Sequence, residues 1–360
     1  MIKIEIYQWS DRSIVSEILN TLSLDGNNSP FLSRDWLLAW IDTAKEDISI
    51  IVFFLNNSPI GITTTSRPVY RFAEIFNETL LNQTGRKQKD QVWIEYNNIL
   101  CEDVYFDACA SALLNHVFLN AKSFRLYISM LHDREKWIAY ARKNKLKIEC
   151  QTVFGYKNNI GGVENTNDLI NKFSSNTRSK LKRSLNLMHS LFGKLKIEMA
   201  EATNFAAFYK ELGKLHKKKW QQSEYGSGFD NPHFNQLHFY LNNNNSQAIK
   251  LLRFSAGSKL VGYSLYLVKN QTVFFYCAGI SENDTHKHMK YGYNMHLEAM
   301  VFFSKIGFTS YDFMGGDAQY KTSLSSHIYE FQNLSIYNPN KTSNIIFYIK
   351  QALKRLRNLF

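Results

Sequence analysis

The sequence lacks the features that mark membrane-spanning, secreted and disulfide-bonded proteins. It contains no run of about 18 uncharged apolar residues, so no transmembrane helix is predicted. The N-terminal residues, MIKIEIYQWSDRS, alternate apolar and polar side chains and lack the hydrophobic region of a signal peptide. The cysteines show no CxxC spacing, which argues against a zinc site or a disulfide framework and predicts a cytoplasmic protein. They are Cys101, Cys109, Cys150 and Cys277.

Metal-binding and nucleic-acid-binding signatures are also absent. The ten histidines include no HExxH or comparable ligand spacing, so no metal is predicted. No RRM, KH or zinc-finger pattern occurs, and nucleic acid is therefore not favoured as the main ligand. The net charge of +12 nevertheless calls for an anionic partner or surface. Nucleotide cofactors, phosphorylated sugars, membrane lipids and nucleic acid all remain open.

The composition is that of a folded protein with room for two domains. Hydrophobic residues make up 44% of the 360 residues, and aromatic residues make up 14%. Hydrophobic periodicity predicts a similar order of elements in each half of the chain. In the first half we expect strand 2–8, helices 13–24 and 34–44, strands 48–55 and 59–66, a strand near 92–95, helix 107–121, strand 124–129, helix 132–144 and strand 146–155. In the second half we expect strand 194–200, helices 204–222 and 233–241, a meander over 248–280, helix 291–307 and strands 308–314 and 328–337.

These elements predict two lobes joined by a bridging helix. The expected N-terminal lobe is 1–156, the linker and bridging helix are 157–193, and the C-terminal lobe is 194–340. Residues 341–360 form a separate segment, in which Ile345, Ile349 and Leu353 recur at helical spacing with lysine and arginine mainly opposite. This basic amphipathic helix fits either peripheral contact with the inner membrane face or docking on the protein body.

Several segments carry a resemblance to a known family. They are SPFLSRDWLLAW, DQVWIEYNNIL, NTRSKLKRSLN, LHKKKW, HKHMKYGYNMHLEAM and YDFMGGDAQYKTSL, spread over residues 29 to 337. In this order they resemble the CelD-like acetyltransferases of the GNAT fold, which are related to the Fem peptidyltransferases. The resemblance implies an α/β (α+β) protein with two tandem GNAT-like lobes, each a mixed, largely antiparallel sheet flanked by helices. It also implies a degenerate first lobe and an acyl-donor site in the second.

The resemblance and the charge together predict an N-acyltransferase. It would move an acyl group from acetyl-CoA or another acyl-CoA to an amine of a carbohydrate or cell-envelope precursor. Two alternatives stay open: a Fem-like transferase that uses aminoacyl-tRNA, and a non-catalytic protein that binds envelope polysaccharide. The phosphate-loop pattern usual in GNAT enzymes is present only in part, which keeps the donor open.

The donor site is expected around the start of helix 291–307. Lys287, Lys290 and Gly292 precede or open this helix, where cations and uncovered amides favour a pyrophosphate. Tyr293 is included in the same site. The resemblance further places Tyr276, Cys277 and Ala278 beside the pantetheine arm. A lone cysteine in an apolar strand is more typical of packing than of covalent catalysis.

The catalytic residues are expected in YDFMGGDAQYKTSL. Acyl transfer to an amine needs a proton acceptor, which Asp312 or Asp317 would supply, and a stabilised oxyanion, which Lys321 would supply. The resemblance places Tyr320 and Lys321 beside the reacting carbonyl. The alternative interpretation is that Asp312 caps a turn and Lys321 is a surface lysine.

Acceptor-binding residues are expected in both lobes. Arg178 and Lys182 would grip a phosphate in the small-molecule or glycan acceptor, although a solvated helix face explains them equally. Glu95, Tyr96 and Asn97 would stack on and hydrogen-bond a sugar. Trp220 shares a helix face with a histidine and would line an interlobe cleft, unless both pack in the core.

Overall fold

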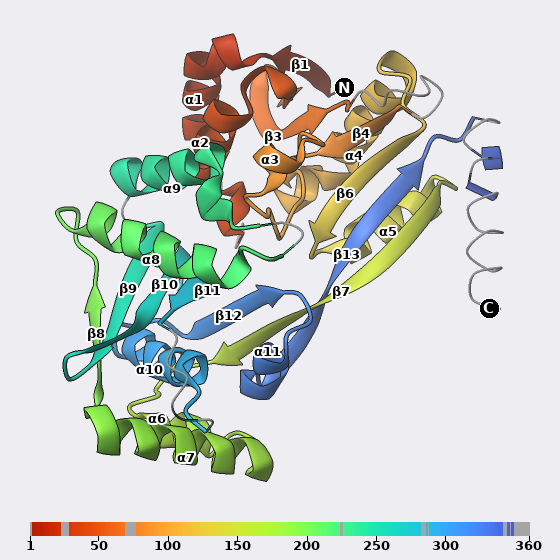
Figure 1. Ribbon diagram of the computed structural model, residues 1–360. Helices are drawn as coiled ribbons and strands as arrows, with labels where there is room; N and C mark the ends of the chain where they lie inside the picture. The colour runs from red at the N-terminus through yellow and green to blue at the C-terminus, as the bar shows by residue number, and fades with distance from the viewer. Residues whose placement is uncertain are drawn as a thin grey trace. The chain divides into compact units, whose positions relative to one another are not determined.

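The chain forms two compact units in a computed structural model (Figure 1). Unit 1 comprises residues 1–153 and 330–360, and unit 2 comprises residues 154–329. The structure describes residues 2–22, 29–68, 77–223, 226–245, 247–281, 286, 288–340, 344–345 and 347–348.

Unit 1 has a mixed sheet whose strands run mainly antiparallel. The strand order is β1-β2-β3-β4-β6-β13, with β5 paired to β3, and the β4–β6 pair is parallel. Helices α4 and α5 supply apolar side chains to the core, which includes Leu113 and Trp137. The elements that begin in this unit are β1 (Lys3–Tyr7), α1 (Arg12–Thr21), α2 (Arg34–Ala44), β2 (Ser49–Leu55), β3 (Ser58–Ser66), β4 (Glu78–Leu81), α3 (Lys87–Asp90), β5 (Leu100–Cys101), α4 (Phe106–Asn115), β6 (Arg125–Leu131), α5 (Arg134–Lys143) and β7 (Lys147–Asn159).

Unit 2 also has a mixed, mainly antiparallel sheet. Its strand order is β7-β12-β11-β10-β9-β8, and the β11–β12 pair is parallel. The elements of this unit are α6 (Thr166–Ile170), α7 (Ser175–Phe192), β8 (Leu195–Met199), α8 (Phe205–Trp220), α9 (Pro232–Asn244), β9 (Ile249–Ala256), β10 (Lys259–Lys269), β11 (Thr272–Ile280), α10 (Tyr291–Lys305), β12 (Ser310–Gly315), α11 (Gln319–Leu324) and the start of β13 (His327–Tyr337).

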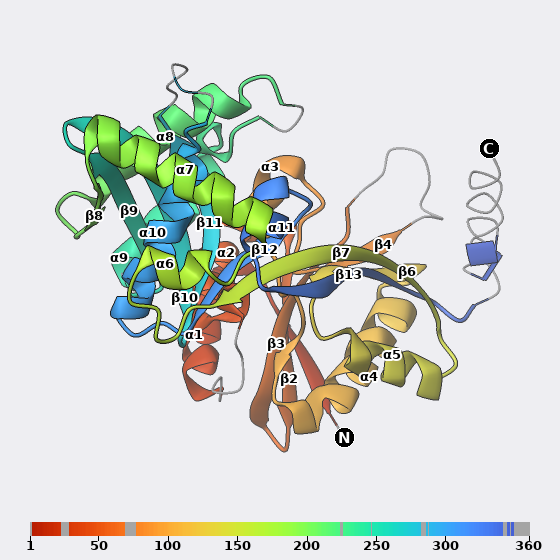
Figure 2. The same cartoon turned by 90° about the horizontal axis from the view of Figure 1, so that it is seen from below.

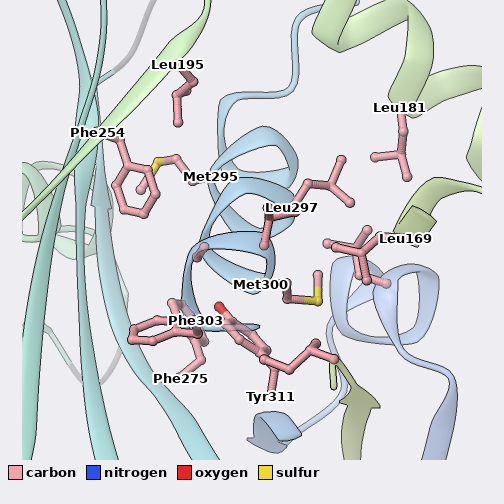
Figure 3. Close-up of a cluster of buried hydrophobic side chains, with 14 of the residues drawn as sticks. Leu169, Leu181, Leu195, Phe254, Phe275, Met295, Leu297, Met300, Phe303 and Tyr311 are labelled. Carbon is pink, nitrogen blue, oxygen red and sulfur yellow. The ribbon is translucent and has the colours of Figure 1, made fainter. Parts of the chain in front are cut away.

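Helices cover both faces of the unit 2 sheet. A Cβ built on Gly279 would lie 2.7 Å from the Leu212 carbonyl oxygen of α8, so only glycine allows this approach. On the other face, α10 packs its apolar side against the sheet, and α6 and α7 cover α10. Figure 3 shows Met295, Leu297, Met300 and Phe303 of α10 in this core, which excludes water almost completely.

Two strands pass from one unit to the other. Strand β7 begins in unit 1, and its last part pairs with β12 in unit 2. Strand β13 begins in unit 2, and its last part pairs with β6 in unit 1 (Figure 2). Unit 1 is therefore completed by the last part of β13, which lies far from its other strands in the sequence, whereas unit 2 is one continuous stretch of the chain.

The predicted mixed, largely antiparallel sheets flanked by helices are confirmed. The expected boundaries differ from the two units in detail, because 157–193 lies inside unit 2 and 330–340 lies in unit 1. The strand predicted near 92–95 is wrong: Val92 and Ile94 are buried in a loop, where Trp93 has a φ of 44°. The helix predicted over 341–360 lies almost entirely outside the described residues.

Candidate functional site

The parallel strands β11 and β12 pair over a short distance and then separate. Their register runs from Thr272 opposite Ser310 to Phe274 opposite Asp312. Beyond this point β11 continues along β10, whereas β12 continues along β7. The register between β10 and β11 also shifts beside Tyr276, which is the extra residue of a β-bulge. The end of β11 thus no longer pairs with β12, and an extended ligand with amide groups would fit such an edge.

The residues predicted for the pantetheine arm lie on this part of β11. Tyr276 is half-buried, and its ring contacts Phe234 and His238 of α9 at centroid distances of 5.9 and 5.0 Å. Ala278 is half-buried against the core. Cys277 is buried, and burial raises the pKa of its thiol. A protonated thiol is a poor nucleophile, so the geometry favours a packing role for Cys277.

The first turn of α10 lies next to the end of β11. A Cβ on Gly292 would lie 2.9 Å from Cδ1 of Ile280, the last residue of β11. Ser184 of α7 accepts a hydrogen bond from the Lys290 amide at 2.8 Å and donates one to Asn294 at 3.0 Å. The first amides of a helix lack intrahelical partners and favour anions. Lys290 is exposed, Tyr293 is half-buried, and the predicted Lys287 lies outside the described residues.

Asp312 shapes the turn that follows β12. Its carboxylate is buried and accepts hydrogen bonds from the Met314 amide at 2.6 Å and from the Tyr329 hydroxyl at 2.7 Å. Met314 and Gly316 both have positive φ, at 60° and 106°. These contacts support the turn-forming interpretation of Asp312 rather than a role as general base.

The short helix α11 carries the remaining motif residues. Lys321 is half-buried, and its Nζ donates a hydrogen bond to the Gly315 carbonyl. Asp317 is exposed just before α11 and remains accessible to a substrate amine. The Tyr320 ring lies near both Phe275 of β11 and Phe313 of β12, with centroid distances of 6.3 and 6.1 Å. The structure therefore brings Tyr320 and Lys321 to the place where the two strands separate.

His296 of α10 also belongs to this cluster, although the sequence analysis did not identify it. The imidazole is buried and stacks on the Tyr320 ring with an interplanar angle of 8°. Burial and the nearby Lys321 and Lys219 charges lower the pKa of His296 to about 3. The only sequence signal is a histidine within the otherwise apolar run of a predicted helix.

The predicted acceptor residues of unit 2 lie on α7 and α8. Arg178 donates a hydrogen bond to the Phe173 carbonyl at 3.3 Å, whereas Lys182 is exposed. Trp220 is 41% exposed at the end of α8 and stacks on the buried His216, with ring centroids 5.9 Å apart. Lys219 also lies over the Trp220 ring, with its Nζ 5.4 Å from the ring centroid. Trp220 thus remains partly exposed, although His216 and Lys219 both contact its ring.

The predicted acceptor residues of unit 1 lie just beyond the parallel pair β4–β6, which corresponds to the pair β11–β12 of unit 2. Strands β4 and β6 pair in parallel only from Glu78 to Leu80. Just beyond, Asn97 donates its side-chain amide to the Leu81 carbonyl at 2.9 Å and its backbone amide to the Met130 carbonyl at 3.1 Å. Asn97 is fully buried and also accepts a hydrogen bond from Asn82. It therefore bridges the two strands, which supports a structural role rather than sugar binding.

Glu95 and Tyr96 precede this bridge. Glu95 is buried, and Tyr96 is half-buried with its ring centroid 4.9 Å from that of Phe331. Tyr96 has a φ of 51°, a conformation that non-glycine residues adopt only where the surroundings enforce it. Neither residue lies fully open to solvent.

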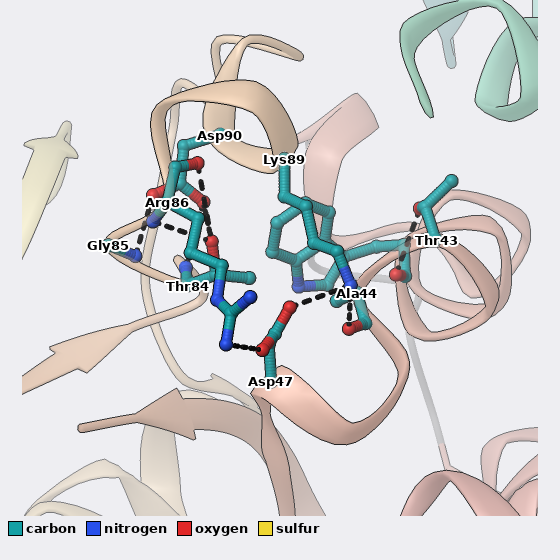
Figure 4. Close-up of polar contacts among 9 residues, drawn as sticks. Thr43, Ala44, Asp47, Thr84, Gly85, Arg86, Lys89 and Asp90 are labelled. Carbon is teal, nitrogen blue, oxygen red and sulfur yellow. Dashed lines mark hydrogen bonds and ion pairs between the residues drawn. The ribbon is translucent and has the colours of Figure 1, made fainter. Parts of the chain in front are cut away.

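The segment before the bridge is held by a polar network. Asp90 accepts hydrogen bonds from the Thr84 and Gly85 amides, both at 2.7 Å. Asp47 forms ion pairs with Arg86 at 2.8 Å and Lys89 at 2.7 Å (Figure 4). These contacts fix the 84–90 segment and so support the position of Asn97.

The described residues contain neither a helix suited to a bilayer nor a cluster of metal ligands. None of the described helices combines the length and apolar character needed to cross a bilayer. Within the same residues, no three histidine, cysteine, aspartate or glutamate side chains gather as metal ligands would.

Comparisons with known proteins point to acyl transfer. Residues 175–322 match the family described as acetyltransferase (GNAT) domain. No protein with a curated description matches the sequence. The second part of the chain therefore carries a GNAT acetyltransferase domain, and the predicted membership of the CelD-like branch stays a prediction.

Solved structures show the same fold over almost the whole chain. A FemX structure superposes with a TM-score of 0.59 at 11% identity, over 94% of this chain and 98% of that one. The C-terminal domain of a putative lysylphosphatidylglycerol synthetase from Agrobacterium fabrum gives 0.56 at 8% identity, over 93% and 96%. A tandem GNAT protein from the clavulanic acid pathway gives 0.50 at 7% identity, over 95% and 100%. At these identities the likeness concerns the fold, which is that of a tandem GNAT protein.

Proposed function

We propose that the protein is an N-acyltransferase that transfers an acyl group from acyl-CoA to an amine of a carbohydrate or cell-envelope precursor. The donor would bind in unit 2. The observation that carries this proposal is the separation of β11 from β12 directly beside the start of α10. A pantetheine arm would pair with the edge of β11, and the diphosphate would lie at the first turn of α10.

The turn after β12 would supply the chemistry. Lys321, held by the Gly315 carbonyl, would stabilise the oxyanion that forms when the amine attacks the thioester. Asp317, which is exposed beside it, would accept the proton from the amine. Asp312 would keep the turn in shape through its bonds to Met314 and Tyr329.

The acceptor class rests on charge and on accessible side chains. The net charge of +12 favours an acceptor with a phosphate or another anionic group. In unit 2, the exposed Lys182 of α7 or the partly exposed Trp220 of α8 would contact it. A cytoplasmic enzyme, with peripheral membrane contact through residues 341–360, would suit such a precursor.

One observation favours a second candidate, a transferase that uses aminoacyl-tRNA. Helix α7 carries four arginine and lysine residues and no acidic residue, which suits a nucleic-acid backbone. A non-catalytic protein that binds envelope polysaccharide is the third candidate, and donor binding separates it from both enzymes.

The test is isothermal titration with acetyl-CoA of the wild type, Gly292→Glu and Lys321→Ala. We expect micromolar binding by the wild type. Gly292→Glu should weaken binding at least about 100-fold, because the new side chain meets Ile280 and adds a negative charge where the diphosphate would lie. Lys321→Ala should bind normally, because its role is in the transition state.

The negative result is also informative. If neither acetyl-CoA nor longer acyl-CoAs bind the wild type, the acyl-CoA proposal fails. Salt-sensitive binding of charged tRNA would then support the second candidate.

A further inference from the structure

His296 lies at a junction of four elements of unit 2. It belongs to α10, and its ring contacts Phe275 of β11 at 4.5 Å and Phe313 of β12 at 5.1 Å between centroids. On a further side it stacks on Tyr320 of α11 at 5.1 Å. These neighbours include both strands at the point where they separate and the helix that carries Lys321.

One hydrogen bond fixes the rotation of this ring. Nδ1 of His296 and the Tyr311 hydroxyl of β12 are 2.8 Å apart. A phenylalanine of similar size would fill the same space but would leave this hydroxyl without that partner. Burying an imidazole among aromatic rings costs free energy unless it is hydrogen-bonded, so the Tyr311 bond is what makes His296 tolerable here.

The stacking of His296 on Tyr320 links the position of the imidazole to that of Lys321. The rings of Tyr320 and His296 are nearly parallel, with an interplanar angle of 8°. Lys321 is the next residue of the same short helix, and its ammonium is held at the Gly315 carbonyl. A change in the His296 ring would therefore shift Tyr320 and, through α11, the Lys321 ammonium.

We propose that His296 is a positioning residue for the Tyr320–Lys321 pair: its ring, locked by Tyr311, sets where the Lys321 ammonium lies at the strand separation. The consequence for catalysis rests on the proposed function. The positioning itself does not, because it concerns contacts within unit 2 alone.

The chain offers a matched control in His238. This residue is also fully buried, and its Nδ1 lies 2.9 Å from a tyrosine hydroxyl, that of Tyr209. Its ring neighbours are Phe234, Tyr209 and Tyr276, none of which belongs to α11. His238→Phe thus also removes a buried histidine–tyrosine hydrogen bond, but the histidine that it replaces has no ring contact with the helix that carries Lys321.

The experiment measures the acetylation rate of Lys321 by sulfo-N-hydroxysuccinimide acetate in the full-length protein. Peptide mass spectrometry gives the rate relative to Lys305, which is exposed at the end of α10. His296→Phe should raise the relative rate about three- to tenfold. Tyr311→Phe should raise it less, because it removes only the hydrogen bond and keeps the imidazole that stacks on Tyr320. His238→Phe should leave the ratio unchanged. Equal ratios in His296→Phe and His238→Phe would overturn the proposal.

A kinetic measurement adds the catalytic consequence. CoA release from acetyl-CoA is followed with glucosamine as the amine, and His296→Phe should lower kcat while the KM for acetyl-CoA stays constant. An unchanged kcat in His296→Phe would contradict the catalytic part. If the wild type releases no CoA with this amine, that result counts against the proposed function for this acceptor, while the Lys321 acetylation rates still decide the positioning.

Discussion

Each unit has a short parallel strand pair that follows a three-stranded meander. The two units differ in what lies just beyond the last paired residues. In unit 1, Asn97 bridges β4 and β6 just beyond the last paired residues. In unit 2, β11 and β12 diverge, and the Tyr320–Lys321 helix stands beside the divergence. The same strand topology is therefore closed by a side chain in unit 1 and leaves a candidate binding edge in unit 2.

Connection length explains how the difference arises. Between β4 and α4 the chain has residues 82–105, which is enough to send a segment back between the strands. Between β11 and α10 it has only residues 281–290. The shorter connection brings the start of α10 next to Ile280 instead. The longer connection of unit 1 thus places Asn97 at the end of the parallel strand pair, where β11 and β12 of unit 2 are no longer paired.

The largest expected effect is on the cooperative unfolding of each unit when it is made as a separate fragment. Fragment 154–329 contains all of unit 2 in one stretch and should unfold cooperatively on heating. Fragment 1–153 lacks Leu334 and Ile336 of β13, which are buried in the unit 1 core, and should show no cooperative transition. Circular dichroism during thermal unfolding measures both. A cooperative transition in 1–153 would show that β13 is dispensable.

The next effect is a difference in acid sensitivity. In unit 2, burial lowers the pKa of His216 to about 4 and those of His238 and His296 to about 3. The unfolded chain, with histidine pKa values near 6.5, binds more protons than the folded unit below that pH. The free energy of unfolding should therefore fall as pH decreases from about 6.5, by about 1.4 kcal/mol per pH unit per histidine.

Unit 1 should respond less over the same range. In the described part of unit 1, the pKa of His116 is lowered by burial, but this histidine is only half-buried. Hydrogen exchange measured at pH 6.5 and pH 5.0 would compare peptides from α8–α10 with peptides from α4–α5. His238→Phe should reduce the slope in unit 2, because it removes one of the histidines whose pKa burial lowers. Equal slopes in the two units would contradict the assignment.

The smallest effect concerns the bridge itself. Asn97→Ala should lower the free energy of unfolding by about 2–3 kcal/mol, because it leaves buried backbone and side-chain groups without partners. Acetyl-CoA binding, measured by titration, should stay constant because the bridge lies in unit 1. Asn120→Ala, at an exposed asparagine of the same unit, should change stability by less than about 0.5 kcal/mol. A loss of donor affinity in Asn97→Ala would break the comparison between the units.

Periodicity alone predicted most of the fold. Helix α2 matches the expected 34–44, and the strands of the meander differ from expectation by one or two residues, because each has a clear apolar face. Strand β4 was missed, since Glu78–Leu81 is too short to show alternation. The strand predicted near 92–95 is wrong although its apolar residues alternate as in a strand. They alternate because they are buried in a strained loop.

The candidate site was predictable only where its residues are close in sequence. Tyr320 and Lys321 were identified together because one motif contains both. The stack of His296 on Tyr320 joins α10 to α11, and no spacing within either helix indicates it. Asn97 was predicted to bind a sugar, and its buried bridging role depends on Leu81 and Met130, which only the folded sheet brings together.

The late position of β13 in the sequence has a consequence for synthesis on the ribosome. The unit 1 sheet cannot be completed until residues 330–337 have been made, long after residue 153. At translation rates of about 5–20 residues per second, the first half waits roughly ten to forty seconds with the edge of β6 unpaired. Unit 2, which is continuous in the chain, has no such delay. The nascent N-terminal half is thus the segment that most needs a chaperone, although it is made first.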